Sequence, residues 1–330
     1  MLQRLSYGLC LALLAGFILK GSWKTPPSPY SLVGATHAHE QSLDGKGVIV
    51  AVLDEGFDSS HTFLKDKFSS FHRYNTTNKK SQDISEALVF ENGKYTFESH
   101  GTHVSGIISN LAPAVQIIPI KIEGVGGDQS FVKALQHAAN SPAHIVNISM
   151  QLSYTGREVS PNVRRALFQL AQAGKLIVIA AGNDGAPLME QPYTSSLVEL
   201  AHNPLMKRRL LLVGASSYKN GTESLAEFSN FPGQFAAGMP QTYFLTAPGE
   251  HIKSAITGGL FAEKSGTSMA APMVAGAASL LKQAYPHLSA EKLSYLLLKS
   301  ARRVTIDGKV LPCSQFGAGI LNLKSALEQG

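Results

Sequence analysis

Six short, almost continuously apolar runs recur along the chain, and they restrict its possible folds more than any other feature. Their residues are mainly Val, Ile, Leu and Ala, without the regular alternation of apolar and polar residues that a half-exposed strand shows. The runs span residues 47–54, 115–122, 143–150, 175–182, 209–215 and 242–249. Strands that are covered on both faces have this composition, so the sequence predicts a mainly parallel sheet.

Helical patterns separate several of these runs. They are FVKALQHAAN after residue 130, PNVRRALFQLAQAG from residue 161 and the stretch that follows Ser268. Repetition of strand, helix and strand predicts an α/β fold: a doubly wound, mainly parallel sheet with helices on both faces, in three layers, connected by right-handed crossovers. The sequence shows no internal repeat, so we expect one domain over residues 35–330, preceded by a linker over residues 25–34.

The first 24 residues have the order of a secretory leader. Arg4 is followed by an apolar stretch over residues 5–19 and then by a polar segment that contains prolines. The apolar stretch is short for a membrane-spanning helix, and no clean cleavage site follows it. Residues 1–24 are therefore either a signal peptide that is removed or an N-terminal anchor that tethers the protein to a membrane. Both alternatives predict an exported protein that is secreted, periplasmic or anchored at the cell envelope.

The charge of the chain argues against a nucleic-acid partner. The formal net charge is +6 at pH 7, but Arg4, Lys20 and Lys24 supply three of these charges, which leaves +3 for the rest of the chain. The basic pairs in that remainder are short, as is typical of solvated surface. We therefore expect no binding to nucleic acid.

Ser268 lies in front of a run of small and apolar residues, SGTSMAAPMVAGAASLLKQAY. Pro272 falls within the first turn of the predicted helix, where its missing N–H costs little, so we expect the helix to begin close to Ser268 with its positive dipole end facing that hydroxyl. A helix that is small or apolar on every side is expected at the centre of the protein. Two interpretations of the segment are open: Thr267 or Ser268 caps the helix, or Ser268 is a fixed nucleophile.

Polar residues close two of the predicted strands, Asp54 the first and Asn183 the fourth. Ligands of such sheets bind beyond the carboxyl ends of the strands, so both side chains are expected to face one crevice, although each alone is also a common turn residue. The segment SHGTHVSG adds His100 and His103. An i, i+3 histidine pair can bind a metal, but no third ligand has suitable spacing nearby.

Together these residues supply all the groups that acyl transfer needs. Ser268 is the candidate nucleophile, His100 the base, Asp54 the acid that orients this base, and Asn183 a side-chain donor to an oxyanion.

The same segments resemble those of subtilisin-type serine peptidases, the subtilases of peptidase family S8. The matching stretches are AVLDEGFDSSH, HGTHVSG, NISM, AAGNDG, VGASSYKNGTESLAEFSNFP, GTSMAAPMVAG and FGAGILNLKSAL, within residues 35–328. The peptidase domain is most similar to the subtilase passenger domains of autotransporters. The resemblance implies a serine endopeptidase that forms an acyl-enzyme on protein or peptide substrates, with Asp54, His100 and Ser268 as the triad and Asn183 as the oxyanion donor.

The chain departs from the family where substrate would bind. Subtilases usually pair an extended peptide with a strand written Ser-Leu-Gly, and the corresponding residues here are Ser149, Met150 and Gln151. The resemblance implies that these residues and Gly182 bind substrate. Gln151 stands where glycine is usual, which leaves two alternatives: its side chain approaches the pocket for the residue before the cut, or a bulge turns it outward.

No cofactor is expected, and two other functions are weighed against peptidase activity. The chain passes from SGIISNLAP directly to VQIIPIKI, without the Asp- or Asn-rich insertion that would form the family's calcium loop after the catalytic histidine. Other calcium sites are left open. An inactive subtilase-like scaffold that binds peptides is the main alternative, although all four chemical positions are filled. Another acyl hydrolase is disfavoured because no G-x-S-x-G surrounds Ser268.

Overall fold

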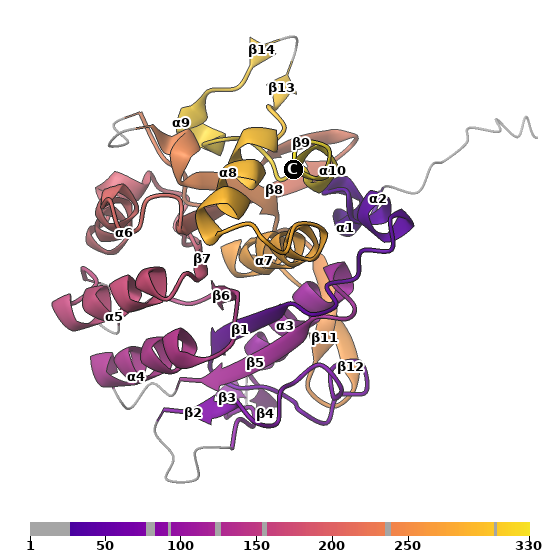
Figure 1. The fold of residues 1–330 in the computed structure, drawn as a ribbon, viewed down its shortest axis with the longest axis vertical. Coiled ribbons are helices and arrows are strands. Elements are labelled where there is room, and N and C mark those ends of the chain that lie inside the picture. The colour runs from indigo at the N-terminus through magenta and orange to yellow at the C-terminus, as the bar shows by residue number, and fades with distance from the viewer. Residues whose placement is uncertain are drawn as a thin grey trace, which may run out of the picture.

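One sheet runs through the molecule, with its strands in the order β10-β8-β7-β6-β1-β5-β2 (Figure 1). The computed structural model describes residues 27–76, 83–91, 94–122, 127–153, 157–234, 239–306 and 309–330. The strands are β1 (Ile49–Asp54), β2 (Tyr74–Asn75), β5 (Gln116–Lys121), β6 (Ile145–Ile148), β7 (Leu176–Ala180), β8 (Leu210–Lys219) and β10 (Phe244–Pro248). Neighbours pair in parallel, and β9 (Thr222–Leu225) adds to β8 in the antiparallel sense. Each of the six apolar runs therefore forms a strand of a mainly parallel sheet, as predicted.

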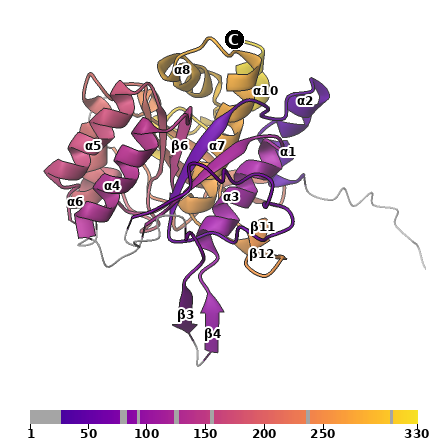
Figure 2. The ribbon, with the colours of Figure 1, turned by 60° about the horizontal axis from the view of Figure 1, so that its bottom comes forward.

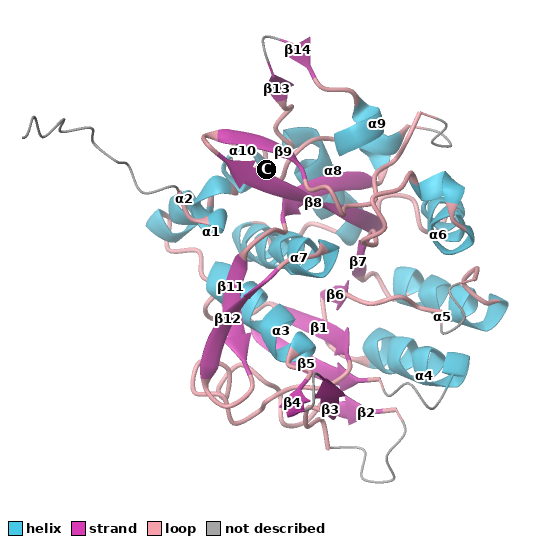
Figure 3. Ribbon diagram, turned by 180° about the vertical axis from the view of Figure 1, so that it is seen from behind, coloured by secondary structure: helices cyan, strands magenta, loops and turns pink. Residues whose placement is uncertain are grey.

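Helices cover both faces of the sheet, which confirms the predicted three-layer α/β fold (Figures 1 and 3). Successive residues of β1 point to opposite faces, so Val50 and Val52 enter one apolar core and Ala51 and Leu53 the other. One face carries α4 (Gly127–Asn140), α5 (Pro161–Gln172) and α6 (Pro192–His202). The other carries α3 (His100–Leu111), α7 (Thr267–Ala284), α8 (Ala290–Ser300) and α10 (Leu323–Leu327).

Helix α7 lies in the middle of the second layer, as the composition of its sequence predicts. Every residue from Met269 to Leu281 is buried. The helix packs on the sheet and against α3, so the small side chains of Ala275 and Ala278 have neighbours on each side. Because α3 and α7 both begin near the carboxyl ends of the strands, their first turns meet at that edge of the sheet.

Short elements extend this framework. The hairpin of β3 (Leu88–Glu91) and β4 (Lys94–Phe97) projects from the body of the molecule just before α3 (Figure 2). A second hairpin, β11 (Ile252–Ile256) and β12 (Leu260–Lys264), leads into α7, and a third joins β13 (Thr305–Ile306) to β14 (Lys309–Val310). The remaining helices are α1 (Pro29–Leu32), α2 (Ala35–Glu40) and α9 (Cys313–Phe316).

The predicted leader, residues 1–24, lies outside the described residues. Within the part of the chain that the structure describes, none of the helices combines the length and apolar character needed to cross a bilayer. The alternatives of a cleaved signal peptide and a membrane anchor both stay predictions.

Candidate active site

Asp54 and His100 meet where β1 ends and α3 begins. Asp54 is the last residue of β1 and is fully buried, and His100 is the first residue of α3. The His100 Nδ1 and Asp54 Oδ1 atoms are 2.8 Å apart, and Asp54 Oδ1 also accepts the backbone N–H of Glu55 at 2.9 Å. Gly101 permits this approach, because a Cβ there would lie 2.9 Å from Asp54 Cβ and still nearer the Gly56 carbonyl oxygen.

The contact with Asp54 changes the acidity of His100. Burial of the imidazole by itself would lower the pKa of His100, but the negative charge of Asp54 and its hydrogen bond outweigh that effect. The pKa of His100 is therefore raised above its ordinary value of 6.5. The imidazolium form, which arises when a base takes a proton, is the form that Asp54 stabilises.

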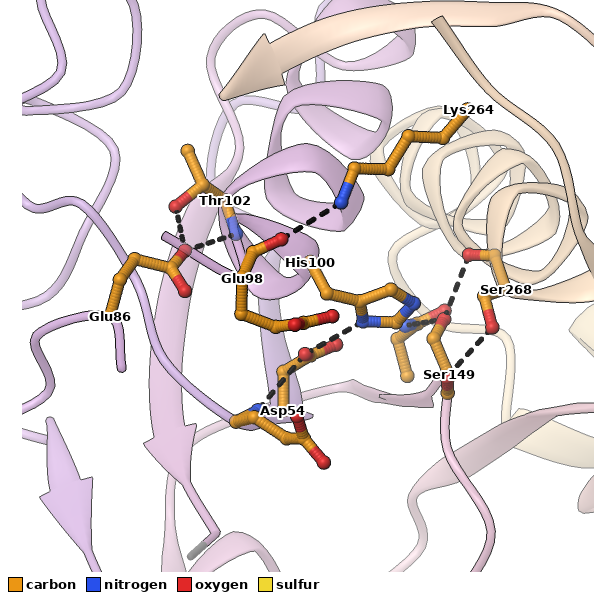
Figure 4. A network of polar contacts seen from close by, with 10 residues as sticks. Asp54, Glu86, Glu98, His100, Thr102, Ser149, Lys264 and Ser268 are labelled. Carbon is orange, nitrogen blue, oxygen red and sulfur yellow. Dashed lines mark hydrogen bonds and ion pairs between the residues drawn. The ribbon is translucent and has the colours of Figure 1, made fainter. Parts of the chain in front are cut away.

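Ser268 lies on the other side of His100 from Asp54 (Figure 4). It is the second residue of α7 and the one residue between Thr267 and Leu281 that is not buried. Its hydroxyl donates to the Ser149 carbonyl oxygen at 2.9 Å. Hydrogen bonds between a nucleophile and its base are often loose until substrate binds, so this orientation is compatible with transfer to His100. The alternative that Thr267 or Ser268 caps the helix is wrong, since neither side chain makes that bond.

Asn183 supplies the hydrogen-bond acceptor at the start of α7. Its Oδ1 atom accepts from the Thr267 backbone N–H at 2.8 Å and from the Thr267 hydroxyl at 2.9 Å. These two bonds fix the orientation of the Asn183 amide at the start of α7. A Cβ at Gly266 would lie 3.5 Å from Asn183 Nδ2 and 3.7 Å from both Asn183 Oδ1 and the Ser268 backbone nitrogen. Because Gly266 has no side chain, the Asn183 amide and the Ser268 backbone nitrogen lie next to a position that a Cβ would otherwise fill.

The predicted substrate-binding residues line one pocket beside Ser268. It has a volume of about 230 Å³, and its lining includes Ser149, Met150, Gln151, Gly182 and Asn183. Gln151 is exposed and borders the pocket, and both alternatives for the direction of its side chain stay predictions. The hydroxyl of Ser149 donates to the Ser268 carbonyl oxygen at 3.1 Å, which ties this stretch to the start of α7.

Asn230 supports the Asn183 turn and was not predicted. It is buried, accepts from the backbone N–H groups of Asp184 and Ala186 at 3.0 and 3.1 Å, and donates to the Ala181 carbonyl oxygen at 3.1 Å. The SNFP segment around it belongs to a longer stretch that resembles subtilases, but nothing local in that sequence points to a contact with residues 181–186. Asn230 therefore holds the loop from which Asn183 projects.

His103 takes no part in this cluster. It is fully buried, lies 3.1 Å through Nε2 from the Ala262 carbonyl oxygen, and burial lowers its pKa to about 4. Among the described residues, no group of three or more His, Cys, Asp or Glu side chains is placed to hold a metal ion. The expectation that the site uses no cofactor stays a prediction.

Known proteins are similar in sequence to most of this chain. The model of the subtilase family matches residues 45–319. Subtilisin BL from Lederbergia lenta is 29% identical over 91% of this chain and 98% of its own length. Alkaline elastase YaB from Bacillus sp. (strain YaB) is 31% identical over 92% of this chain and 70% of its own length.

Solved structures share the fold. Fervidolysin from Fervidobacterium pennivorans superposes with a TM-score of 0.71 at 24% identity, over 92% of this chain and 45% of that chain. A protease from Pseudoalteromonas arctica PAMC 21717 gives 0.66 at 23% identity, over 88% of this chain and 92% of that chain. At these identities the two structures bear on the fold alone. The family match and the sequence relatives carry the further conclusion: this chain belongs to the subtilase family and is a serine endopeptidase.

Proposed function

We propose that Ser268 is the nucleophile of this peptidase, that His100 is its general base and that Asp54 orients His100. The observation that carries the proposal is that His100 lies between the Asp54 carboxylate, at 2.8 Å, and Ser268, which alone among residues 267–281 of α7 is not buried (Figure 4). His100 takes the proton of Ser268 as the oxygen attacks a peptide carbonyl, and it then returns that proton to the leaving amine. Water repeats the sequence on the acyl-enzyme and restores the serine.

We propose that Asn183 Nδ2 and the Ser268 backbone N–H stabilise the tetrahedral oxyanion. Support comes from the position that a Cβ of residue 266 would occupy, which lies 3.5 Å from Asn183 Nδ2 and 3.7 Å from the Ser268 backbone nitrogen and is left free by glycine. The positive end of the α7 dipole acts on the same space. Thr267 holds the Asn183 carbonyl oxygen, so the amide does not have to reorganise when charge develops.

We propose that the stretch Ser149 to Gln151 receives the substrate main chain as an added strand, with Gly182 on the opposite wall of the pocket. The fixed position of Ser149 against Ser268 supports this geometry. The pocket of about 230 Å³ receives the side chain before the cut, and Gln151 borders it. An inactive scaffold is not favoured, because the pocket is open and each chemical position is filled. Export of the protein is supported by the leader-like order of residues 1–24 and remains part of this proposal.

The proposal predicts covalent labelling of Ser268 by a fluorophosphonate probe. The folded protein is incubated with the probe, digested, and the modified residue is identified by mass spectrometry. We expect one adduct, on Ser268, whose formation is blocked by prior acid or heat denaturation and is absent from His100→Ala. Failure of the folded protein to react, or equal reaction in His100→Ala, would contradict the proposed roles.

Asn183→Ala is expected to lower kcat by about 10²- to 10³-fold with little change in KM, a loss that corresponds to roughly 3 kcal/mol and is known for the corresponding donor of subtilisin. The reason is that the donor acts on charge that exists only in the transition state. Steady-state kinetics on a peptide substrate measure the two constants.

Asn183→Asp is the matched control, because it keeps the oxygen that accepts from Thr267 but removes the N–H donor. We expect Asn183→Asp to be as inactive as Asn183→Ala and to melt close to the wild type. Full kcat in Asn183→Asp would mean that Asn183 serves only to cap α7.

A further inference from the structure

A buried carboxylate, Glu86, lies against the start of α3 from the side away from Ser268 (Figure 4). Glu86 precedes the β3–β4 hairpin, and only 8% of the residue is exposed. Its Oε1 atom accepts from the Thr102 backbone N–H at 3.3 Å and from the Thr102 hydroxyl. Neither the triad nor the oxyanion donors involve this residue.

The N-cap residue of α3 makes no capping hydrogen bond, and Glu86 supplies an acceptor at the start of this helix instead. Ser99 precedes the helix with φ at +55° and makes no capping bond. Its hydroxyl instead donates to Thr257 Oγ1 at 3.0 Å and accepts from the Thr257 backbone N–H at 3.1 Å. The first N–H groups of a helix have no partner within it, and the Thr102 N–H is one of these. The Glu86 carboxylate satisfies it from a segment 16 residues earlier.

The direction of the second bond is fixed by Asp58. The Asp58 backbone N–H donates to Thr102 Oγ1 at 2.8 Å, so the hydroxyl proton of Thr102 is free to point at Glu86. Thr102 therefore joins the Glu86 segment to the loop that follows Asp54. His100 lies two residues before Thr102 in the same helical turn. The hydrogen bonds of Thr102 with Glu86 and Asp58 therefore hold the backbone segment that carries the imidazole.

Glu86 occupies an unfavourable site for a carboxylate. Burial raises the pKa of Glu86 and the nearby charge of Asp54 raises it further, although the hydrogen bond from Thr102 offsets part of this rise. No cation among the described residues forms an ion pair with Glu86. Its Oε2 atom is buried without a hydrogen-bond partner in that part of the chain. An apolar side chain would avoid these penalties, but it would leave the start of α3 without an acceptor.

We propose that Glu86 is a positioning residue for the reaction: by accepting from Thr102 it fixes the first turn of α3 and thereby the place of His100 between Asp54 and Ser268. This inference rests on the proposed role of His100. Small displacements of a catalytic group cost large factors in rate, so the effect is on turnover and acylation, with substrate binding unchanged.

The test compares Glu86→Ala and Glu86→Gln with Ser160→Ala. Ser160 caps α5 on the opposite face of the sheet, where its hydroxyl accepts the Val163 N–H at 3.4 Å, so its loss gives a matched control for a missing cap far from the site. We expect Glu86→Ala to lower kcat about tenfold or more at unchanged KM. Glu86→Gln, which retains an acceptor oxygen, should recover most of the rate, and Ser160→Ala should lower the melting temperature without changing kcat.

Thr102→Val tests the same joint without altering Glu86, since valine keeps the shape of threonine but has no hydroxyl, and it should also lower kcat. If Glu86→Ala or Thr102→Val melts earlier but retains full kcat, or if Glu86→Gln is as slow as Glu86→Ala, the inference is overturned. His100→Ala distinguishes failure of the proposed function from failure of the Glu86 inference. Full activity in His100→Ala would refute the proposed function itself. If His100→Ala is inactive but Glu86→Ala and Thr102→Val retain full kcat, only the Glu86 inference is refuted.

Discussion

Ser268→Ala is expected to reduce kcat for a peptide substrate by about 2 × 10⁶, the loss found when the corresponding serine of subtilisin is removed. In the proposed mechanism the Ser268 hydroxyl oxygen forms the acyl-enzyme, so no covalent path remains without it. The oxyanion donors and the pocket survive the change, and a residual acceleration of about 10³- to 10⁴-fold over water is expected from them.

The variant should remain folded. Ser268 is partly exposed, and its hydroxyl makes one hydrogen bond, to the Ser149 carbonyl oxygen. Losing such a bond costs about 1 kcal/mol, which small changes in the melting temperature would report. Purified protein, free of contaminating peptidases, is assayed beside the wild type with the same substrate. Activity above 1% of the wild type in a folded Ser268→Ala would place the nucleophile elsewhere.

The sequence predicts the central strands and α7 well, because an element that is buried on every side consists of a continuous run of apolar or small residues. In β1, each residue from Val50 to Leu53 is apolar since every one of them enters a core. The hairpin of β3 and β4 is harder to predict from the sequence, because its strands are short and some of their apolar side chains, such as Leu88 and Phe97, are exposed. The likeness to autotransporter passenger domains concerns a subfamily that the matched relatives do not address, and it stays a prediction.

Some residues of the candidate site can likewise be predicted from the sequence, and others cannot. Asp54, His100, Asn183 and Ser268 are recognisable because each lies in a short, specific motif at the end of a strand or the start of a helix. The residues that hold them in place are not recognisable, since their partners are distant in sequence. Glu86 reaches Thr102 across 16 positions, and Asn230 meets its partners across more than 40. Only the folded chain brings such pairs together.

Asp54→Asn is expected to lower kcat by about 10⁴-fold near neutral pH. In the proposed mechanism Asp54 accepts from His100 Nδ1, which lies 2.8 Å from its Oδ1 atom, and so keeps the proton on that nitrogen and leaves Nε2 as the base. An asparagine can present its own N–H to Nδ1 and select the other tautomer, in which Nε2 carries the proton and does not act as a base. Kinetics with a peptide substrate from pH 5 to pH 9 would measure the loss.

The pH profile gives a second readout of the same change. In its proposed role His100 is a base only when neutral, and because its pKa is raised from 6.5, we expect the acidic limb of kcat/KM in the wild type above pH 6.5. Without the Asp54 charge, desolvation dominates and the pKa of His100 falls, so the limb of the residual activity should move to lower pH. Glu55→Gln is the control, because it removes a neighbouring charge and leaves the bond to Nδ1 intact: the limb should shift in the same direction by less, with kcat retained. An Asp54→Asn profile that overlays the wild type would show that this carboxylate does not set the acidity of the base.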